Sequence, residues 1–313
     1  MVPRPSALIG ALAVALVALG ACTAAPSENP ATTNDAPPPS AGAAPSESAP
    51  PADRVYVSLG DSYATGYRPP AAGTSASADQ GGFAHLVAER SDLRLINVAC
   101  SGATTTQLRD GPACSPGNAA PGAPDPAGLG QLDAAVRALR EHQGRVGLVT
   151  VVIGGNDLAP CAQASDALGC ASQAVANVRA GLAAALPALR EAAGDTPIVG
   201  LTYPDVFLGA WVSPAFPNGR DLARLSVPLF RDLFNAALKA EYEKVGAAFV
   251  DVTASTGGYG SFTELTQDPT YGSIPTSVAK VCALTYFCGY TDVHPTPDGH
   301  EAIAAAVLTA TGR

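Results

Sequence analysis

Short apolar runs alternate with longer amphipathic segments from Arg54 to the C-terminus. The apolar runs predict five strands, at 54–59, 93–99, 146–153, 197–202 and 248–252. Between them, hydrophobic residues recur at helical spacing and predict helices around 83–90, 129–139, 175–189 and 229–238. A last helix should begin after Thr296, with Pro297 at its first position and Gly312 beyond its end.

The five predicted strands lack a clear alternation of apolar and polar positions. Strands of this kind are buried on both faces, as in parallel sheets covered by helices. The pattern therefore predicts an α/β fold, with a single doubly wound, flavodoxin-like parallel sheet of about five strands in a three-layer α/β/α arrangement. In such a sheet the loops at the carboxyl ends of the strands gather at one edge, which is where binding sites form.

The first 53 residues do not follow this pattern. Arg4 and an apolar run at 7–19 precede Leu-Gly-Ala-Cys at 19–22, in the order of a secretory leader. The run is too short to span a membrane, which takes about 20 residues. Leu-Gly-Ala-Cys also resembles a bacterial lipoprotein box, whose cysteine is acylated and becomes the first mature residue. We expect a lipoprotein-type signal peptide at 1–21 and a lipid anchor on Cys22; an ordinary signal peptide with a coincidental cysteine is the alternative.

Residues 23–53 are mostly alanine, proline, serine, glutamate, asparagine and threonine, without a large apolar side chain. Such a stretch cannot bury enough surface to offset the entropy of ordering it, so a disordered linker is expected. The predicted organisation is a signal peptide at 1–21, the anchor cysteine and linker at 22–53, and one globular domain at 54–313.

The composition allows a sizeable core and argues against one class of partner. Hydrophobic residues make up 47% of the 313 residues, and the net charge is −9. Because no run of lysine or arginine is present to bind a phosphate backbone, a nucleic-acid partner is not expected.

The chain has seven cysteines, which divide into Cys22 and six others. An even number in an exported chain favours disulfides, although 15 pairings of six cysteines are possible. The six fall into three pairs that are close in sequence, which predicts the bridges Cys100–Cys114, Cys161–Cys170 and Cys282–Cys288. Zinc binding is the weaker alternative, since no Cys-x-x-Cys occurs and only four histidines are present. We expect no metal and no organic cofactor.

Four motifs lie at predicted strand ends or just before the last helix. They are Val-Ser-Leu-Gly-Asp-Ser-Tyr at 57–63, Asn-Val-Ala-Cys-Ser-Gly-Ala-Thr at 97–104, Val-Ile-Gly-Gly-Asn-Asp at 152–157 and Asp-Val-His-Pro at 292–295. Together and in this order they resemble the four blocks of the SGNH (GDSL) hydrolase family, over about residues 54–312. The chain is similar in detail to secreted actinobacterial lipases of that family, which carry cysteines near the same blocks.

A serine and a histidine in these motifs have the chemistry of a nucleophile and its base. Ser62 is the expected nucleophile, because a hydroxyl becomes reactive when a neighbouring base takes its proton; the alternative is a helix N-cap. His294 is the expected general base. The other histidines, His85, His142 and His300, lie within or at the end of helical patterns and are expected to be structural or exposed.

The resemblance also assigns the donors that would stabilise an oxyanion. They are the backbone N–H groups of Ser62 and Gly102 and the side-chain amide of Asn156. A glycine permits close approach of the backbone, and an amide donates without changing charge. The alternatives are a turn glycine and an Asx turn. Asp61 and Asp157 are expected to shape their turns rather than take part in the reaction.

One position departs from the family pattern. The family places an aspartate three residues before the histidine, and Thr291 occupies that position here. Two interpretations stay open. Either Asp292 orients the His294 ring as the third member of a triad, which we prefer slightly, or the Thr291 carbonyl accepts the ring N–H and the site is a dyad.

Apolar side chains gather in two segments near these motifs. The segment 203–218 contains Val206, Phe207, Leu208, Trp211, Val212 and Phe216, and much of the remaining aromatic content lies at 259–290. These side chains either line an acyl pocket, dip into a lipid surface, or cap the core.

The sequence therefore predicts an exported serine ester hydrolase, an esterase or lipase acting on short- to medium-chain acyl esters through an acyl-enzyme. It is expected to be a monomer, facing outward from the membrane through lipidated Cys22 or secreted, with a small-molecule or lipid ester as substrate. One alternative is an O-deacetylase of carbohydrate or cell-envelope polymer, and another is a non-catalytic envelope-binding lipoprotein. A fold alone would not decide between these functions.

Overall fold

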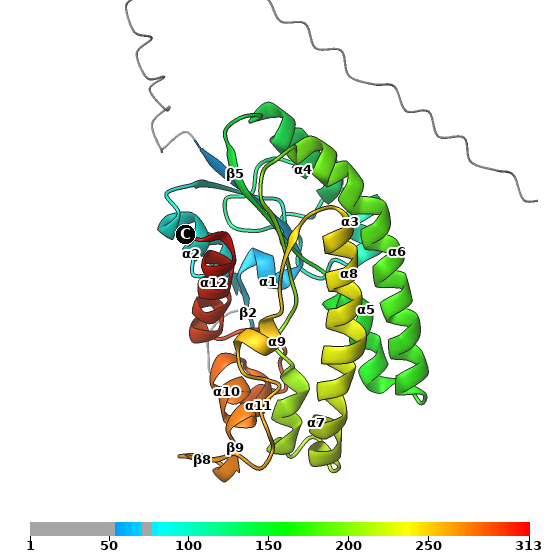
Figure 1. Ribbon diagram of the computed structural model, residues 1–313, viewed down its shortest axis with the longest axis vertical. Coiled ribbons are helices and arrows are strands. Elements are labelled where there is room, and N and C mark those ends of the chain that lie inside the picture. The colour runs from blue at the N-terminus through cyan, green and yellow to red at the C-terminus, as the bar shows by residue number, and fades with distance from the viewer. Residues whose placement is uncertain (1–53, 71–76) are drawn as a thin grey trace, which may run out of the picture. The chain divides into compact units, whose positions relative to one another are not determined.

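The computed structural model describes residues 54–70 and 77–313 of the chain. The predicted signal peptide, Cys22 and the linker lie outside the described residues. The centre of the domain is a five-stranded parallel sheet in the order β4-β1-β5-β6-β7 (Figure 1). Its strands are β1 (Val55–Gly60), β4 (Arg94–Asn97), β5 (Val146–Val152), β6 (Ile198–Leu201) and β7 (Ala248–Val250).

The strand order decides where a site can form. Counted along the chain, the second of these strands lies beside the first, and the third, fourth and fifth follow on its other side. This is the flavodoxin-like order, in which chain direction across the sheet reverses beside the first strand and leaves a crevice at the carboxyl ends. The loops after β4, β1 and β5 therefore meet at this crevice. The predicted fold class, a three-layer α/β/α domain around a parallel sheet, is confirmed.

Helices cover both faces of the sheet. The helix α6 packs against α3, α4 and α8, while α12 packs against α2 and β7 (Figure 1). The helices are α1 (Ser62–Thr65), α2 (Phe83–Arg90), α3 (Thr105–Asp110), α4 (Gln131–Glu141), α5 (Gly155–Leu158), α6 (Ala167–Ala193), α7 (Gly219–Pro228), α8 (Ala236–Lys244), α9 (Val252–Ser255), α10 (Thr276–Leu284), α11 (Phe287–Tyr290) and α12 (Pro297–Thr311), with the 3₁₀ segments η3 (Ala159–Gln163) and η4 (Val206–Trp211) and the π-helical segment η5 (Leu229–Asn235).

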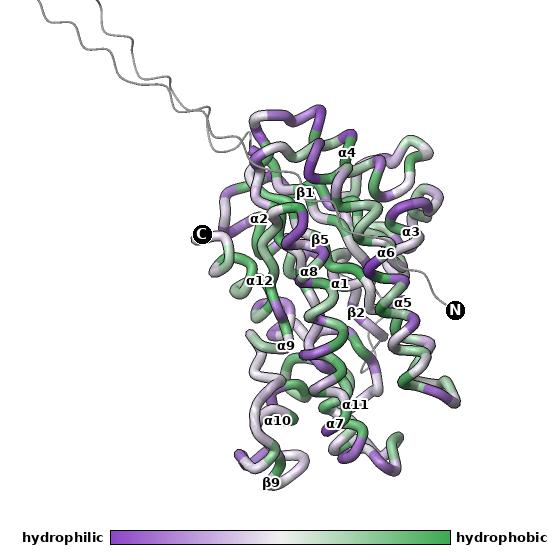
Figure 2. The backbone as a smooth tube through the Cα atoms, turned by 45° about the vertical axis from the view of Figure 1, so that its right-hand side comes forward, coloured by the Kyte–Doolittle hydropathy of each residue, from purple (hydrophilic) through white to green (hydrophobic). Residues whose placement is uncertain are grey.

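The core lies between these layers. The strands β1 and β6 are buried at every position, and β5 at every position but its first. Along the flanking helices, green hydrophobic positions are interrupted by purple hydrophilic ones (Figure 2), as expected for helices with one buried face. On α6 the five positions that the sequence marks as one face are all buried: Val175, Val178, Leu182, Leu186 and Leu189.

Most predicted elements have close counterparts, and two predictions differ in detail. The predicted helix at 229–238 begins as the π-helical η5 and becomes regular only in α8. The predicted last strand is shorter, because Asp251 accepts a hydrogen bond from the Ala254 N–H and caps α9 where the strand was expected to continue. Two small antiparallel pairs were not predicted: β2 (Tyr67–Arg68) with β3 (Ser77–Ala78), and β8 (Leu265–Asp268) with β9 (Gly272–Pro275).

Three disulfides fasten loops around the carboxyl edge of the sheet. They join Cys100 to Cys114, Cys161 to Cys170 and Cys282 to Cys288, which are the predicted pairs. Within residues 54–70 and 77–313, no helix is both long and apolar enough to cross a membrane.

Candidate active site

Ser62 is placed by a tight turn at the end of β1. Gly60 has φ +143°, and a Cβ there would lie 2.1 Å from the Val152 carbonyl oxygen of the neighbouring strand, so only glycine fits. The Asp61 backbone N–H donates to that same carbonyl (3.1 Å). The Asp61 side chain accepts from the Tyr63 N–H (3.0 Å) and caps α1. The N-cap is thus Asp61, and Ser62 is left with its hydroxyl free for another contact.

His294 lies on the loop between α11 and α12. Its carbonyl accepts a hydrogen bond from the Tyr286 N–H (3.0 Å), and the hydroxyl of Tyr63 donates to the carbonyl of the preceding Val293 (2.5 Å). The Tyr67 ring lies 4.5 Å from the imidazole, centre to centre. Side chains from α1 and β2 therefore hold the histidine loop against the turn that carries Ser62.

The three residues form one hydrogen-bonded chain. The Ser62 Oγ lies 2.9 Å from His294 Nε2, and Asp292 Oδ1 lies 2.8 Å from His294 Nδ1. The same Oδ1 accepts the His294 backbone N–H (2.9 Å). With Nδ1–H donating to the carboxylate, Nε2 carries the lone pair that faces the serine hydroxyl. The ring is oriented by Asp292, and among the described residues it makes no hydrogen bond to the Thr291 carbonyl.

The carboxyl groups around this chain have opposite electrostatic environments. Burial tends to raise the pKa of Asp292, but the hydrogen bonds from His294 outweigh it and hold the pKa below its ordinary value. Burial raises the pKa of Asp61 to about 6, against the opposing hydrogen bonds from Tyr203 and Tyr63. Asp292 therefore stays charged beside the ring, whereas Asp61 carries a proton more readily than an exposed aspartate.

The predicted oxyanion donors lie on both sides of Ser62. Gly102 follows β4 and has φ +83°, with no atom within 4 Å of where a Cβ would be, so space is open beside its backbone. Asn156 follows β5, and its Nδ2 donates to the Ala103 carbonyl (2.9 Å). An amide nitrogen has two hydrogens, so one N–H of Asn156 stays available. Asp157 ties the two loops together by accepting from the backbone N–H and hydroxyl of Thr105 (2.9 and 2.8 Å).

The three other histidines do not contact Ser62. His85 lies within α2, and His142 caps the end of α4. His300 is fully buried in α12, where its Nδ1 accepts the Phe83 N–H (3.3 Å) and burial lowers its pKa to about 3.

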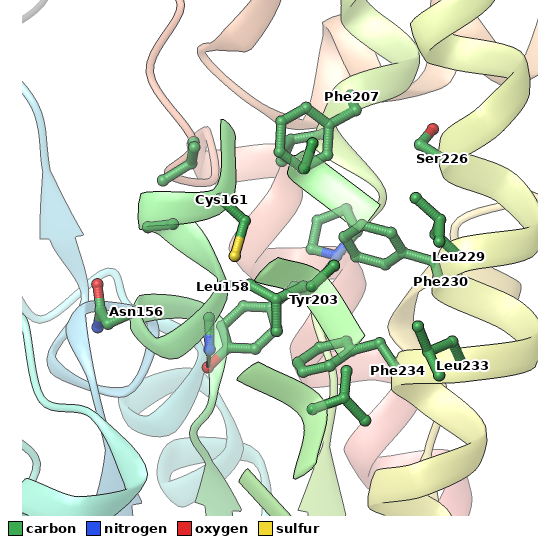
Figure 3. Close-up of a pocket in the computed structure, with 18 of the residues that line it drawn as sticks. Asn156, Leu158, Cys161, Tyr203, Phe207, Ser226, Leu229, Phe230, Leu233 and Phe234 are labelled. Carbon is green, nitrogen blue, oxygen red and sulfur yellow. Dashed lines mark hydrogen bonds between the residues drawn. The ribbon is translucent and has the colours of Figure 1, made fainter. Parts of the chain in front are cut away.

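A largely apolar cavity of about 230 Å³ opens beside Ser62. Phe230 and Phe234 project into it from η5, toward the ring of Tyr203 and Leu158 (Figure 3). Residues around Ser62 and His294 form one wall: Asp61, Ser62, Tyr63, Gly155, Asn156, Tyr203 and Val293. The segments α5, η3 and α6 form a second wall with Leu158, Ala159, Cys161, Ala167, Ala171 and Val175. The chain from 204 to 234 supplies the rest: Pro204, Val206, Phe207, Phe216, Leu222, Ser226, Leu229, Phe230, Leu233 and Phe234.

The two apolar segments of the sequence have different places. From 203–218, the side chains of Val206, Phe207 and Phe216 line the cavity, whereas Trp211 packs outside it. No residue of 259–290 lines the cavity. Phe287 packs behind the lining residue Phe216, and their rings stack with 5.6 Å between centres. The interpretation as an acyl pocket therefore fits part of the first segment only.

Sequence reasoning missed Tyr203. Its hydroxyl donates to Asp61 Oδ2 (2.6 Å) and accepts the Gly155 N–H (3.0 Å), so it connects the cap of α1 to the loop that carries Asn156. Burial raises the pKa of Tyr203 well above its ordinary value, which keeps this donor protonated. The signal was present, since Tyr203 follows β6 at the same carboxyl edge as the four motifs.

The described residues, 54–70 and 77–313, contain no group of three or more histidine, cysteine, aspartate or glutamate side chains that could hold a metal ion.

Comparison with known proteins relates this geometry to a family. The model of the GDSL-like lipase/acylhydrolase family matches residues 58–302. An extracellular lipase from Streptomyces rimosus has the same fold, with a TM-score of 0.53 and 21% identity over 82% of this chain and 99% of that one. A phospholipase A1 from Streptomyces albidoflavus gives 0.49 and 18%, over 82% and 99%. A carbohydrate esterase family 2 enzyme from Corynascus thermopiles gives 0.44 and 18%, over 86% and 69%. No curated protein matches the chain.

Proposed function

This chain belongs to the GDSL-like lipase/acylhydrolase family and is an ester hydrolase of that type. On this basis we propose that it is an exported carboxylester hydrolase. It would cleave short- to medium-chain acyl esters through a serine acyl-enzyme. The observation that carries the proposal is the 2.9 Å contact between Ser62 Oγ and His294 Nε2 at the wall of an apolar cavity. It joins a nucleophile and base to a place for an acyl chain.

The proposed acylation step uses each residue of the hydrogen-bonded chain. Ser62 Oγ attacks the ester carbonyl carbon while His294 Nε2 takes the hydroxyl proton. Asp292 holds the ring in the required tautomer and stabilises the imidazolium that forms. The tetrahedral oxyanion then accepts hydrogen bonds from the Ser62 and Gly102 N–H groups and from Asn156. A donor of this type is worth roughly 10²–10³ in rate.

Collapse of the intermediate breaks the ester C–O bond, and His294 gives its proton to the departing alcohol. Water then enters, His294 removes a proton from it, and the resulting attack releases the carboxylic acid and restores Ser62. These steps consume one water for each ester and need no group beyond the residues named here.

The cavity supports an acyl chain as the group that lies next to Ser62. Its walls are mainly Leu, Val, Ala and Phe side chains, and each methylene buried there contributes about 0.8 kcal/mol. An O-deacetylase would use the same catalytic residues, but its acetyl group would fill little of an apolar cavity of about 230 Å³. A non-catalytic binding protein would have no need for the aligned serine, histidine and aspartate.

Export is supported by the leader pattern at 1–21 and by three disulfides, which persist in oxidising compartments. We propose that acylation of Cys22 tethers the chain to the outer face of the membrane, or that the chain is secreted where it is not acylated. We further propose that it works as a monomer on a small-molecule or lipid ester, without nucleic acid or cofactor.

Hydrolysis of a p-nitrophenyl ester series from acetate to palmitate tests the proposal. We expect turnover to be greatest at medium chain length and to fall roughly 10⁴–10⁶-fold in Ser62→Ala. The control is Ser255→Ala, which removes an exposed hydroxyl bonded only to the Val252 carbonyl. Full activity in Ser62→Ala would refute the serine mechanism. If the folded, disulfide-bonded wild type hydrolysed no p-nitrophenyl ester but released acetate from acetylated glycans, it would be identified as a deacetylase.

A further inference from the structure

The exposed apolar side chains of the domain are concentrated at one edge of the sheet. Among the described residues, the large hydrophobic side chains that are exposed are Leu168, Leu225, Leu265, Tyr290 and Val293, at 43–59% exposure. They belong to the start of α6, to α7, β8 and α11, and to the loop before His294, all of them segments at the carboxyl edge of the sheet. Figure 1 shows α7, α11, β8 and β9 grouped at the lower end of the view.

A cluster of arginine and aromatic side chains lies among these elements. Trp211 of η4 stacks on Phe262 with 5.2 Å between ring centres and an interplanar angle of 8°. The guanidinium group of Arg224 lies 4.8 Å from the Trp211 ring and 5.9 Å from the Phe262 ring, and that of Arg220 lies 5.3 Å from Trp211. We call these four residues, with Leu225, the α7 patch.

The charges of the α7 patch are incompletely neutralised. Arg224 is 3.4 Å from Asp221, but both side chains are more than half exposed, so this pair is weak. Arg220 forms no ion pair within residues 54–70 and 77–313. Its guanidinium group is therefore available to a phosphate, which arginine binds through two parallel hydrogen bonds.

The α7 patch shares its helices with the cavity. Leu225 is followed by Ser226, which lines the cavity, and η4 carries both Trp211 and the cavity residue Phe207. Val293, one of the exposed side chains, lines the cavity itself and precedes His294. The α7 patch and the cavity are therefore built on the same elements, η4 and α7, and the exposed Val293 connects the cavity to the surface.

We propose that the α7 patch docks on an anionic phospholipid surface. Tryptophan favours the boundary between water and acyl chains, leucine enters the acyl layer, and arginine binds lipid phosphates. Because the chain carries a net charge of −9, an anionic surface attracts it through local positive groups, which Arg220 and Arg224 supply in the α7 patch. This inference rests on the proposed function only in assigning a lipid ester to the cavity; the docking itself requires no catalysis.

Trp211 makes the docking directly measurable, because it is the only tryptophan of the chain. The full-length Ser62→Ala protein is titrated with vesicles of phosphatidylglycerol or phosphatidylcholine that carry bromine on their acyl chains, and tryptophan fluorescence is recorded. We expect quenching that saturates at lower lipid concentration with phosphatidylglycerol. Attachment through Cys22 alone would bring the protein to vesicles without quenching Trp211.

Variants assign the binding to the α7 patch. Arg220→Gln and Arg224→Gln should each raise the lipid concentration at half-saturation about fivefold, and Leu225→Ser should reduce the quenching at saturation. The control is Arg140→Gln, an exposed arginine in the last turn of α4 at the opposite edge of the sheet, which should change neither.

Two outcomes would overturn the proposal. The first is that neither lipid quenches the Trp211 fluorescence of folded protein. The second is that the protein dimerises and Leu225→Ser abolishes the dimer, which would make the α7 patch an interface between two copies. Hydrolysis of water-soluble p-nitrophenyl acetate by the wild type does not depend on a lipid surface. If the wild type hydrolyses this ester but its Ser62→Ala variant is not quenched by lipid, the docking has failed and the proposed function has not.

Discussion

Asp292 and His294 are two residues apart, so one short loop supplies both the proposed base and the carboxylate bonded to its ring. Thr291 adopts a positive φ of 56°, which turns the chain back just before Asp292. A single oxygen of the carboxylate then meets both the backbone N–H and the ring Nδ1 of His294. The closeness in sequence compensates for the missing aspartate at position 291, because the turn brings the carboxylate to the same ring nitrogen.

At the residue scale, the first prediction concerns Asp292→Asn. An asparagine in this place can present an N–H to Nδ1 and so favour the wrong tautomer, and it cannot stabilise the imidazolium. We expect kcat on p-nitrophenyl esters to fall roughly 10³–10⁴-fold at pH 7 with little change in KM.

The matched control is Asp298→Asn, which removes an exposed carboxylate from the first turn of α12 and should leave kcat unchanged. A rate for Asp292→Asn within a few fold of wild type would show that the ring is oriented by another group, the Thr291 carbonyl being the candidate.

The residues of the site differ in how well the sequence predicts them. Ser62, Gly102 and Asn156 follow strands that end at the same edge, and His294 precedes a clearly capped helix, so strand-end reasoning brings them together. The choice between Asp292 and Thr291 stayed open, because it depends on the turn at Thr291 rather than on spacing. Tyr203 was missed because its partner Asp61 is 142 residues away and no motif surrounds it.

At the scale of elements, the cavity is made by helices that meet across the carboxyl edge. The first half of α6 contributes small side chains, Ala167, Ala171 and Val175, while η5 opposite contributes Phe230 and Phe234. The disulfide Cys161–Cys170 ties the preceding η3 to the start of α6. The volume available to a substrate therefore depends on the small residues of α6, which leave room in front of the aromatic wall.

The second prediction follows from this wall. Ala171→Leu adds three carbons to a buried position that lines the cavity. We expect kcat/KM for p-nitrophenyl octanoate to fall roughly 10–100-fold while that for the acetate stays within a few fold, because only the longer acyl chain needs the filled space.

Ala176→Leu provides the comparison, since Ala176 is an exposed position on the same helix. It tests whether leucine in α6 has a general effect on folding. If Ala171→Leu lowered the rates of acetate and octanoate equally, the cavity would not be the acyl site.

The cavity also shows what periodicity cannot predict. The positions Leu229 and Leu233 mark a helical face in the sequence, as do Val175 and its neighbours, and both faces read as core. Some of these side chains are buried in the core, whereas others line the cavity. The packing of α6 against η5 separates the two groups. The π-helical geometry of η5 adds to the uncertainty, because the helical periodicity that predicts this segment assumes regular α-helix.

At the scale of the whole molecule, the fold follows from burial. Runs such as 146–153 match strands covered on both faces, and the alternation of strands and helices favours a parallel sheet with helices on both sides. The small pairs β2–β3 and β8–β9 are only two to four residues long, so they leave no comparable pattern. The sheet order then places the loops after β4, β1 and β5 side by side, and the chemistry follows from that placement.

The central claim is that Ser62 is a nucleophile activated by His294, and covalent capture tests it most directly. The full chain is treated with a fluorophosphonate, and the modified peptide is identified by mass spectrometry while ester hydrolysis is followed. The account predicts one adduct, on Ser62, that forms in parallel with the loss of activity and is absent from Ser62→Ala. An active enzyme that acquires no adduct, or acquires it on another residue while Ser62 stays unmodified, would contradict the account.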